Sequence, residues 1–191
     1  MALTDDAHRL IKQHLTTHEQ PRALAVDATC GQGADTEFLL DLGFNTVLAF
    51  DVQAKAIELT RQRVQSLGAP NSERAKLIHD GHQNLENYLS QHNNQRMAQC
   101  IMFNLGYLPT ANKNQTTKAD TTIIALNAAI QNLSANGIIS VMCYPGHPAG
   151  AIEKQTVTKW LTELNEDWQT ELHEGAAPKP TAPVLYLIYR C

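Results

Sequence analysis

The chain has 191 residues, 43% of them hydrophobic, and a formal net charge of −4. This length and composition suit a single domain spanning residues 1–191 with a substantial buried core. The acidic balance excludes a global positive field that would attract nucleic acid, although a local basic patch stays compatible with it. There is no signal peptide and no apolar run long enough to cross a bilayer, so we expect a cytoplasmic protein with no membrane partner.

Apolar runs and amphipathic segments alternate along the chain. Residues 4–18 have apolar positions at helical spacing and predict a leading helix. Strands are then expected near residues 22–27, 46–51, 75–79, 97–104, 137–144, 167–173 and 183–190, and helices near 35–42, 53–66, 83–91, 119–134 and 150–164. Asn136-Gly137 predicts a turn before the fifth strand.

This order of elements predicts a Rossmann-like α/β fold. Repeated β-α units imply a mostly parallel sheet with helices on both faces. The loop over residues 175–183 is rich in proline and alanine and leaves no helix between the last two strands. Those strands should therefore form an antiparallel hairpin, so that the sheet has seven strands with the last one antiparallel.

The segment VDATCGQGADT, residues 26–36, joins the first predicted strand to a helix through a glycine turn. Gly31 and Gly33 lack a Cβ atom, so the backbone can take unusual dihedrals and approach a ligand closely. The helix that follows offers free N–H groups and a partial positive charge. This is the usual construction for holding a nucleotide-like cofactor, although the glycine turn alone is a weak signal.

Two details favour S-adenosylmethionine over a dinucleotide. A dinucleotide site normally has a third glycine where this chain has Thr36, and it gains nothing from the carboxylate of Asp27. S-adenosylmethionine carries an ammonium group, which suits Asp27, and a carboxylate, which suits the N–H groups of the loop that includes Thr29 and Asp35. Asp35 and Thr36 could instead only cap the helix.

The next two strand ends also have acids. Asp51 follows Gly31 by twenty residues, and with Gln53 it lies where it could accept hydrogen bonds from both ribose hydroxyls, although it could also cap the next helix. Asp80-Gly81-His82 follows the third strand, beside the expected position of the base. Asp80 could accept from the adenine amino group while backbone N–H groups near Gly81 and His82 face a ring nitrogen, or the segment could be an ordinary turn.

The fourth predicted strand runs into Asn104-Leu105-Gly106-Tyr107, which has the layout of the Asn-Pro-Pro-Tyr loop of enzymes that methylate exocyclic amines. The Asn104 side-chain oxygen could accept an N–H of the amine and aim its lone pair at the methyl group. Tyr107 could offer a face for a nucleobase to stack on. Alternatively, Asn104 caps a turn and Tyr107 packs in the core.

His147 is the third candidate catalytic residue. It lies in a Pro/Gly loop after the fifth predicted strand, and its ordinary pKa is near neutrality. It could take the proton that the amine loses, bond to an RNA phosphate, or simply hold the loop in place.

With these segments together, the chain resembles the YtqB/MnmM-like family of class I methyltransferases, a group also labelled rRNA methylases. The resemblance runs across nearly the whole chain and is carried by DATCGQGADTEFL, FDVQ, FNLGYLP, TTKADTT and YPGHPAG. It implies a Rossmann-like methyltransferase fold with S-adenosylmethionine as cofactor. It also implies methylation of the 5-aminomethyl group of 2-thiouridine at the wobble position, with the anticodon region of tRNA as partner.

Other functions stay open on the sequence. The acceptor could be rRNA or a small-molecule amine, and a homodimer would enlarge the surface for RNA. Thr36 and Asp27 disfavour a nicotinamide oxidoreductase, and Asn104 with Tyr107 disfavours a non-catalytic cofactor-binding module. We expect no metal, because the four cysteines form no C-x-x-C pair and the histidines at positions 14 and 18 have no evident third ligand.

Overall fold

The computed structural model describes residues 2–18, 22–91, 97–106, 116–177 and 179–191. Its strands are β1 (Leu24–Asp27), β2 (Thr46–Asp51), β3 (Ala75–His79), β4 (Ala98–Leu105), β5 (Leu133–Cys143), β6 (Trp168–Glu174) and β7 (Val184–Arg190). Its helices are α1 (Leu3–Thr17), α2 (Ala34–Asp41), α3 (Ala54–Ser66), α4 (Ala69–Arg74), α5 (Leu85–Gln91), α6 (Ala119–Gln131) and α7 (Pro148–Thr162), with a short 3-10 helix η1 (His82–Asn84). None of the helices in these residues is long and apolar enough to span a membrane.

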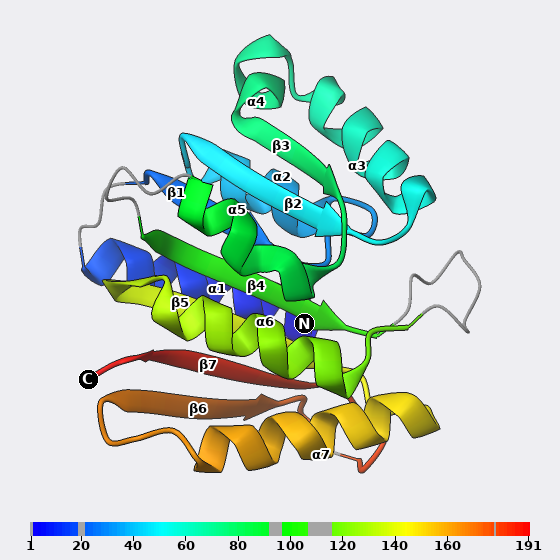
Figure 1. Cartoon of the computed structure of the whole chain (residues 1–191), viewed down its shortest axis with the longest axis vertical. Helices are drawn as coiled ribbons and strands as arrows, with labels where there is room; N and C mark the ends of the chain where they lie inside the picture. The colour runs from blue at the N-terminus through cyan, green and yellow to red at the C-terminus, as the bar shows by residue number, and fades with distance from the viewer. Residues whose placement is uncertain (1, 19–21, 92–96, 107–115, 178) are drawn as a thin grey trace.

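The seven strands form one sheet in the order β3-β2-β1-β4-β5-β7-β6 (Figure 1). Strands β1 to β5 pair in parallel, whereas β7 is antiparallel to both of its neighbours, β5 and β6. The predicted seven-stranded sheet with its last strand antiparallel is therefore confirmed. Because β1 and β4 are adjacent although they are far apart in sequence, the strand order reverses there, which is where such sheets bind ligands.

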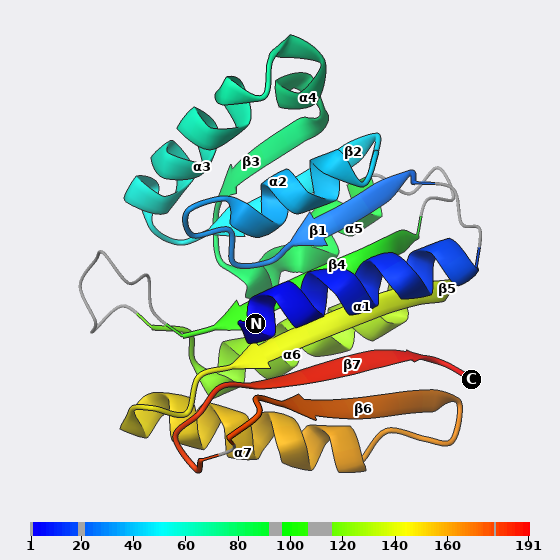
Figure 2. The same cartoon turned by 180° about the vertical axis from the view of Figure 1, so that it is seen from behind.

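Helices cover both faces of the sheet and leave no face of its central strands exposed. Figure 2 shows α1, α2 and α3 on one side, and Figure 1 shows α5, α6 and α7 on the other. Buried Ile11, Leu39 and Val64 pack on the first face, and buried Leu89 and Leu126 on the second. Successive residues of a strand point to opposite faces, so a strand buried on both faces must be apolar throughout. Strand β4 meets this requirement over residues 100–103, because these four apolar residues are buried and alternate between the two clusters.

Two elements differ from the sequence-based expectation. Helix α4 was not predicted, since it has no buried residue and hence no apolar periodicity. Tertiary contacts hold it instead, because Arg74 donates to the carbonyl oxygens of Phe44 (2.6 Å) and Leu40 (3.0 Å). The predicted Asn136-Gly137 turn is wrong, because β5 begins at Leu133 and includes both residues. The extra residues of β5 are accommodated at an irregularity opposite β4, between Ala98 and Cys100.

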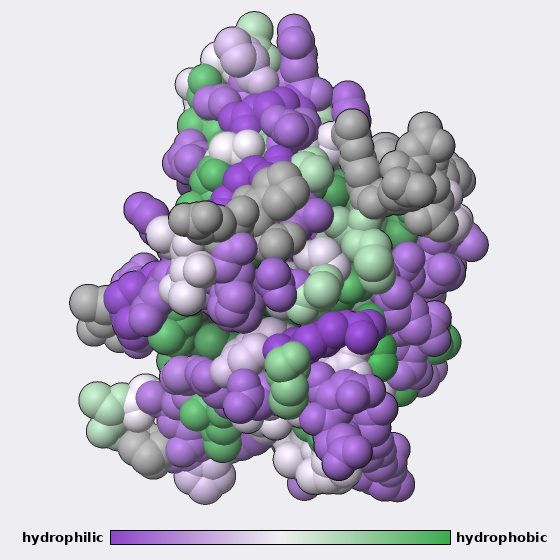
Figure 3. Space-filling view, turned by 90° about the vertical axis from the view of Figure 1, so that its left-hand side faces the viewer, coloured by the Kyte–Doolittle hydropathy of each residue, from purple (hydrophilic) through white to green (hydrophobic). Residues whose placement is uncertain are grey.

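The two ends of the parallel strands have different surroundings. The face at their amino ends is largely hydrophilic, with hydrophobic side chains in small separate patches (Figure 3). At the opposite edge the chain begins with α1, which runs back along the sheet from that point (Figures 1 and 2). The loops that follow β1 to β5 gather at this same edge, so any ligand site of the fold is expected there.

The two strands at the borders of the sheet, β3 and β6, are the least buried. Five of the seven residues of β6 are exposed, among them Glu171, Leu172 and Glu174. Tyr189 of β7 donates its hydroxyl to Glu171, and the His173 ring lies 3.0 Å from the same carboxylate. Strand β6 therefore packs against β7 through its backbone and a few polar side chains and contributes little to the core.

Candidate active site

A cavity of about 1120 Å³ opens at the carboxyl ends of the parallel strands. It is lined by the start of α1 and by the loops after β1, β2, β3, β4 and β5. The predicted site residues on its wall are Thr29, Gly31, Asp35, Asp51, Gln53, Asp80, His82, Asn104 and His147. Four predicted residues do not line it, namely Asp27, Gly33, Thr36 and Gly81, and Tyr107 lies outside the described residues.

Glycine is needed at the two positions of the first loop, 31 and 33, for different structural reasons. Both have positive φ angles, 53° at Gly31 and 80° at Gly33, which L side chains rarely adopt. Gly31 lies on the cavity wall, whereas Gly33 packs against α3, where a Cβ atom would lie 3.0 Å from the Cα of Thr60. Gly33 therefore allows α2 to begin close to α3, and the free N–H groups at the start of α2 follow it directly.

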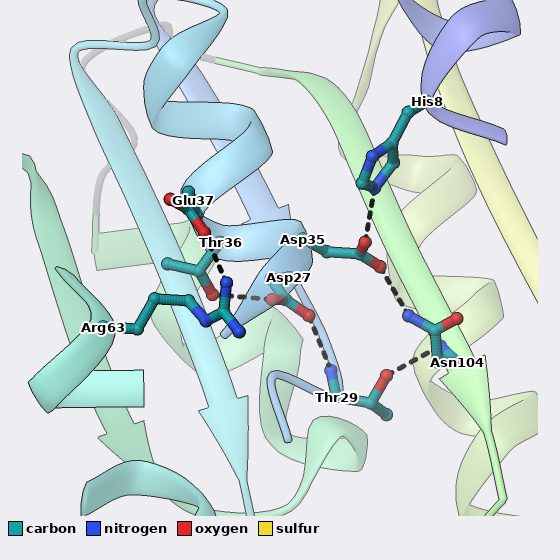
Figure 4. A network of polar contacts seen from close by, with 8 residues as sticks. All are labelled: His8, Asp27, Thr29, Asp35, Thr36, Glu37, Arg63 and Asn104. Carbon is teal, nitrogen blue, oxygen red and sulfur yellow. Dashed lines mark hydrogen bonds and ion pairs between the residues drawn. The ribbon is translucent and has the colours of Figure 1, made fainter. Parts of the chain in front are cut away.

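Asp27 lies beneath this loop. It is fully buried, its Oδ2 accepts from the Thr36 hydroxyl at 2.6 Å, and its Oδ1 accepts from the Thr29 N–H at 3.3 Å (Figure 4). Burial, with the nearby Asp35 carboxylate, raises the pKa of Asp27 to about 8. These bonds hold the loop from beneath, and neither Asp27 nor Thr36 lines the cavity. The direct cofactor contact expected from the sequence stays a prediction.

Asp51 lies on the cavity wall at the end of β2. Its Oδ2 accepts from the Gly31 N–H at 3.0 Å and its Oδ1 accepts from the Gln53 N–H at 2.9 Å. Burial raises its pKa from the ordinary value. Each carboxylate oxygen can accept more than one hydrogen bond, so the carboxylate keeps capacity for two hydroxyl donors while it fixes the loop.

The third strand end forms a turn, one of the two alternatives left open by the sequence, and the adenine contact stays a prediction. Asp80 forms a turn, because its Oδ1 accepts from the Gly81 N–H (2.7 Å) and the Asn84 side chain (2.8 Å), and its Oδ2 accepts from the Tyr88 hydroxyl (3.0 Å). It also lines the cavity. Gly81 does not line the cavity, whereas the buried residue His82 does. Burial lowers the pKa of His82 to about 4, so its ring is neutral near pH 7.

Asn104 connects the first loop with the end of β4. Its backbone N–H donates to the Thr29 hydroxyl at 2.7 Å, and its side-chain Nδ2 donates to Asp35 Oδ2. The other oxygen of Asp35 lies 2.6 Å from Nε2 of His8, a residue of α1 that sequence analysis did not select (Figure 4). Asp35 therefore bridges two elements that are distant in sequence, rather than capping α2, whose N-cap Gly33 receives no side-chain bond.

Glu153 of α7 is a buried acid that bonds to two threonines near the cavity. The Gly106 carbonyl accepts from the Thr117 N–H at 3.0 Å. Thr117 and Thr122 donate their hydroxyls to Glu153 of α7 at 2.6 and 2.7 Å. Burial raises the pKa of Glu153, which is only 1% exposed. Nothing in the sequence around Glu153 indicates this contact, because the threonines are over thirty positions away.

His147 is the N-cap residue of α7. Its Nδ1 accepts from the Gly150 N–H at 3.1 Å, a bond that uses the lone pair of that nitrogen. This geometry supports the loop-holding alternative for His147 over the general-base alternative.

Tyr144 is an aromatic residue of the cavity wall that sequence analysis missed. It follows β5 directly, and a Cβ atom at Gly106 would lie 3.5 Å from its ring, so the ring flanks the segment after Asn104. Tyr144 could have been found from the sequence, because it lies at the carboxyl end of a predicted strand. The same criterion selected Asp51 and Asn104 as candidate site residues. Within the described part of the chain, no group of three or more His, Cys, Asp or Glu residues could hold a metal ion.

Comparison with known proteins places these features in a family. Residues 47–189 match the family model described as "Putative rRNA methylase". A relative from Arabidopsis thaliana, the chloroplastic tRNA (mnm(5)s(2)U34)-methyltransferase, is 35% identical over 174 residues. That alignment covers 86% of this chain and 62% of the relative, so the chain spans less than two thirds of the relative's length.

Solved structures agree with the fold. A "putative rRNA-methylase" from Clostridium thermocellum has a TM-score of 0.87 and 34% identity, covering 98% of this chain and 97% of that one. A "putative methyltransferase" from Streptococcus mutans, solved in complex with SAH, has a TM-score of 0.82 and 30% identity, covering 100% of this chain and 99% of that one.

Proposed function

Because the chain belongs to the rRNA methylase family, we propose that it is an S-adenosylmethionine-dependent methyltransferase that methylates an amine of RNA. The observation that carries the proposal is the meeting of Asp51 and Asn104 on one cavity wall, at the reversal of strand order. Asp51 suits the ribose hydroxyls of the cofactor, and Asn104 suits the substrate amine. A module that only binds the cofactor would need Asp51 but not Asn104.

The charges of the cavity fit the cofactor. Among the described lining residues, Asp5, Asp35, Asp51 and Asp80 outnumber the single lysine, Lys118. S-adenosylmethionine carries a sulfonium and an ammonium group against one carboxylate, so an acidic cavity favours its binding. The carboxylate itself suits the N–H groups at the start of α2, and Asp51 suits the two ribose hydroxyls.

The cofactor supplies a methyl group bonded to a positively charged sulfur. Asn104 would accept one N–H of the substrate amine on Oδ1, which aims the nitrogen lone pair at the methyl carbon. The nitrogen forms its new bond to carbon as the carbon–sulfur bond breaks, SAH is released, and the methylated amine gives its extra proton to water. A neutral amine needs orientation more than a base, which agrees with the bonded Nδ1 of His147.

The proposed acceptor is the 5-aminomethyl group of 2-thiouridine at the wobble position of tRNA. The name of the Arabidopsis relative, which specifies a modified uridine at tRNA position 34, supports this choice. The family description supports rRNA as the alternative, and a small-molecule amine is a further one. Tyr144 and Tyr107 are then the candidate stacking partners for the base.

The test is mass analysis of nucleosides from tRNA carrying 5-aminomethyl-2-thiouridine after incubation with the protein and S-adenosylmethionine. We expect one added methyl group on that nucleoside, and an addition about 10²-fold slower with Asn104→Ala, which should still bind SAH in calorimetry. If the intact protein binds SAH but adds no methyl group, the tRNA assignment is wrong. The same assay on rRNA and on small amines then identifies the acceptor.

A further inference from the structure

The side chains of His8, Asp35 and Asn104 form a continuous chain of hydrogen bonds from α1 to the end of β4 (Figure 4). We propose that His8 is a positioning residue that, through Asp35, fixes which atom of the Asn104 carboxamide is presented to the substrate amine. This inference rests on the proposed function, because it assigns a device to the same acceptor site.

The chemistry of Asp35 decides the orientation of Asn104. A carboxylate oxygen only accepts hydrogen bonds, so the carboxamide atom facing Asp35 Oδ2 must be the donor, Nδ2. The oxygen Oδ1 then becomes the atom that accepts from a substrate. If the carboxamide turned over, Nδ2 would face the amine, and a donor would meet a donor.

Asp35 in turn needs a second partner to hold its own orientation. A carboxylate with one bonded oxygen can rotate about its side chain, whereas one with both oxygens bonded to different elements cannot do so without breaking a bond. His8 supplies the second bond at 2.6 Å, and because the carboxylate only accepts, Nε2 of His8 is the donor. The side chain of Asp35 is 12% exposed and that of His8 is 27% exposed, so water competes only partly for these positions.

A second contact holds His8 itself. Its ring stacks on Phe38 of α2, with the ring centroids 3.8 Å apart and the planes within 1° of parallel. The start of α1 is thereby fixed against α2 through the ring face, and Nε2 is directed at Asp35. These two contacts can be separated by substitution: His8→Phe keeps a ring for Phe38 and removes the N–H donor, whereas His8→Gln keeps an N–H donor and removes the ring.

The experiment measures single-turnover methyl transfer to tRNA carrying 5-aminomethyl-2-thiouridine, together with the Kd for SAH. We expect His8→Phe to slow transfer about tenfold or more while the Kd changes by less than about threefold, since a misdirected acceptor costs rate rather than cofactor affinity. His8→Gln should retain the rate within about threefold because it retains the donor. The matched control is His18→Gln, which changes the histidine at the C-cap of α1, where its Nδ1 lies 2.8 Å from the His14 carbonyl oxygen. A His8→Phe protein that transfers methyl at the unsubstituted rate overturns the proposal.

A second readout does not depend on activity. In ¹⁵N-labelled protein, the side-chain NH₂ signals of Asn104 are identified by their loss in Asn104→Ala. We expect them to exchange with solvent about tenfold faster in His8→Phe than in the unsubstituted protein, and to be little changed in His8→Gln and His18→Gln. If the unsubstituted protein methylates no tRNA, the proposed function fails, and these signals alone decide the positioning role. Equal exchange in His8→Phe and the unsubstituted protein refutes it, and His8→Leu replaces His8→Phe if the latter does not fold.

Discussion

The bond between Thr36 and Asp27 allows a prediction of stability. Thr36→Val keeps the shape of the side chain and removes the hydroxyl that donates to Asp27 Oδ2 at 2.6 Å. Both residues are 0% exposed, so water cannot replace the lost donor. Leaving a buried, potentially charged oxygen without its partner costs about 2 kcal/mol, within a range of roughly 1–3 kcal/mol. For a domain of this size that cost lowers Tm by about 4–8 °C.

The cost should also depend on pH. The pKa of Asp27 in the folded protein is raised to about 8, so its contribution to stability is fully present at low pH and is lost as the pH rises from about 3.8 to about 8. The Thr36 hydroxyl opposes this loss, because it stabilises the charged form and lowers the pKa. Without it the pKa rises further, and the destabilisation by Thr36→Val should be larger at pH 9 than at pH 6.

The assay is thermal and urea unfolding of the protein without cofactor at both pH values, and Thr60→Val is the matched control. Thr60 is equally buried, but its hydroxyl donates to the neutral Gly31 carbonyl at 3.3 Å, so we expect a cost nearer 0.5–1 kcal/mol that is about the same at both pH values. The reasoning is refuted if Thr36→Val costs no more than Thr60→Val, or if its cost falls as the pH rises.

Three further predictions concern the site. Asp51→Asn should weaken SAH binding about tenfold or more in calorimetry, since it exchanges two charge-assisted ribose bonds for weaker ones; unchanged affinity would contradict the ribose assignment. Asn104→Ala should lower turnover by about 10²-fold while the Kd for SAH stays within about threefold, and equal losses in both would mean that Asn104 serves the cofactor instead. His147→Ala should cost about 1 kcal/mol of stability through the lost cap of α7 and leave the pH–rate profile unchanged; loss of an ionisation near neutral pH would restore the general-base role.

The sequence predicted the fold well because every strand except the exposed border strand β6 is signalled by a local apolar run. The strand ends were predicted for the same reason, and Asp51, Asp80 and Asn104 all lie on the cavity wall. Helix α4 and the early start of β5 were missed because their causes are tertiary: the bonds of Arg74 to Phe44 and Leu40, and the irregular pairing beside Ala98.

The site was predicted less completely, since proximity in sequence does not tell which side chain of a loop faces the ligand. Asp27 and Asp35 lie on either side of the same glycine loop, yet the first is buried under it and the second is on the cavity wall. His8 lines the cavity and Glu153 bonds to the lining residue Thr117, but both lie on helices whose sequences indicate only an amphipathic surface. Their partners are 27 and over 30 positions away, beyond the range of any local pattern.

The acidic border strand β6 has a consequence for assembly. An exposed border strand has unpaired backbone groups that can recruit a strand from another molecule, and charged side chains on it oppose this recruitment by repelling an identical strand. The exposed Glu171 and Glu174 would face their own copies, or lie near them, if two sheets joined through β6. We therefore expect any homodimer to form through helices or loops, and we expect the folded protein to resist growth into extended sheets.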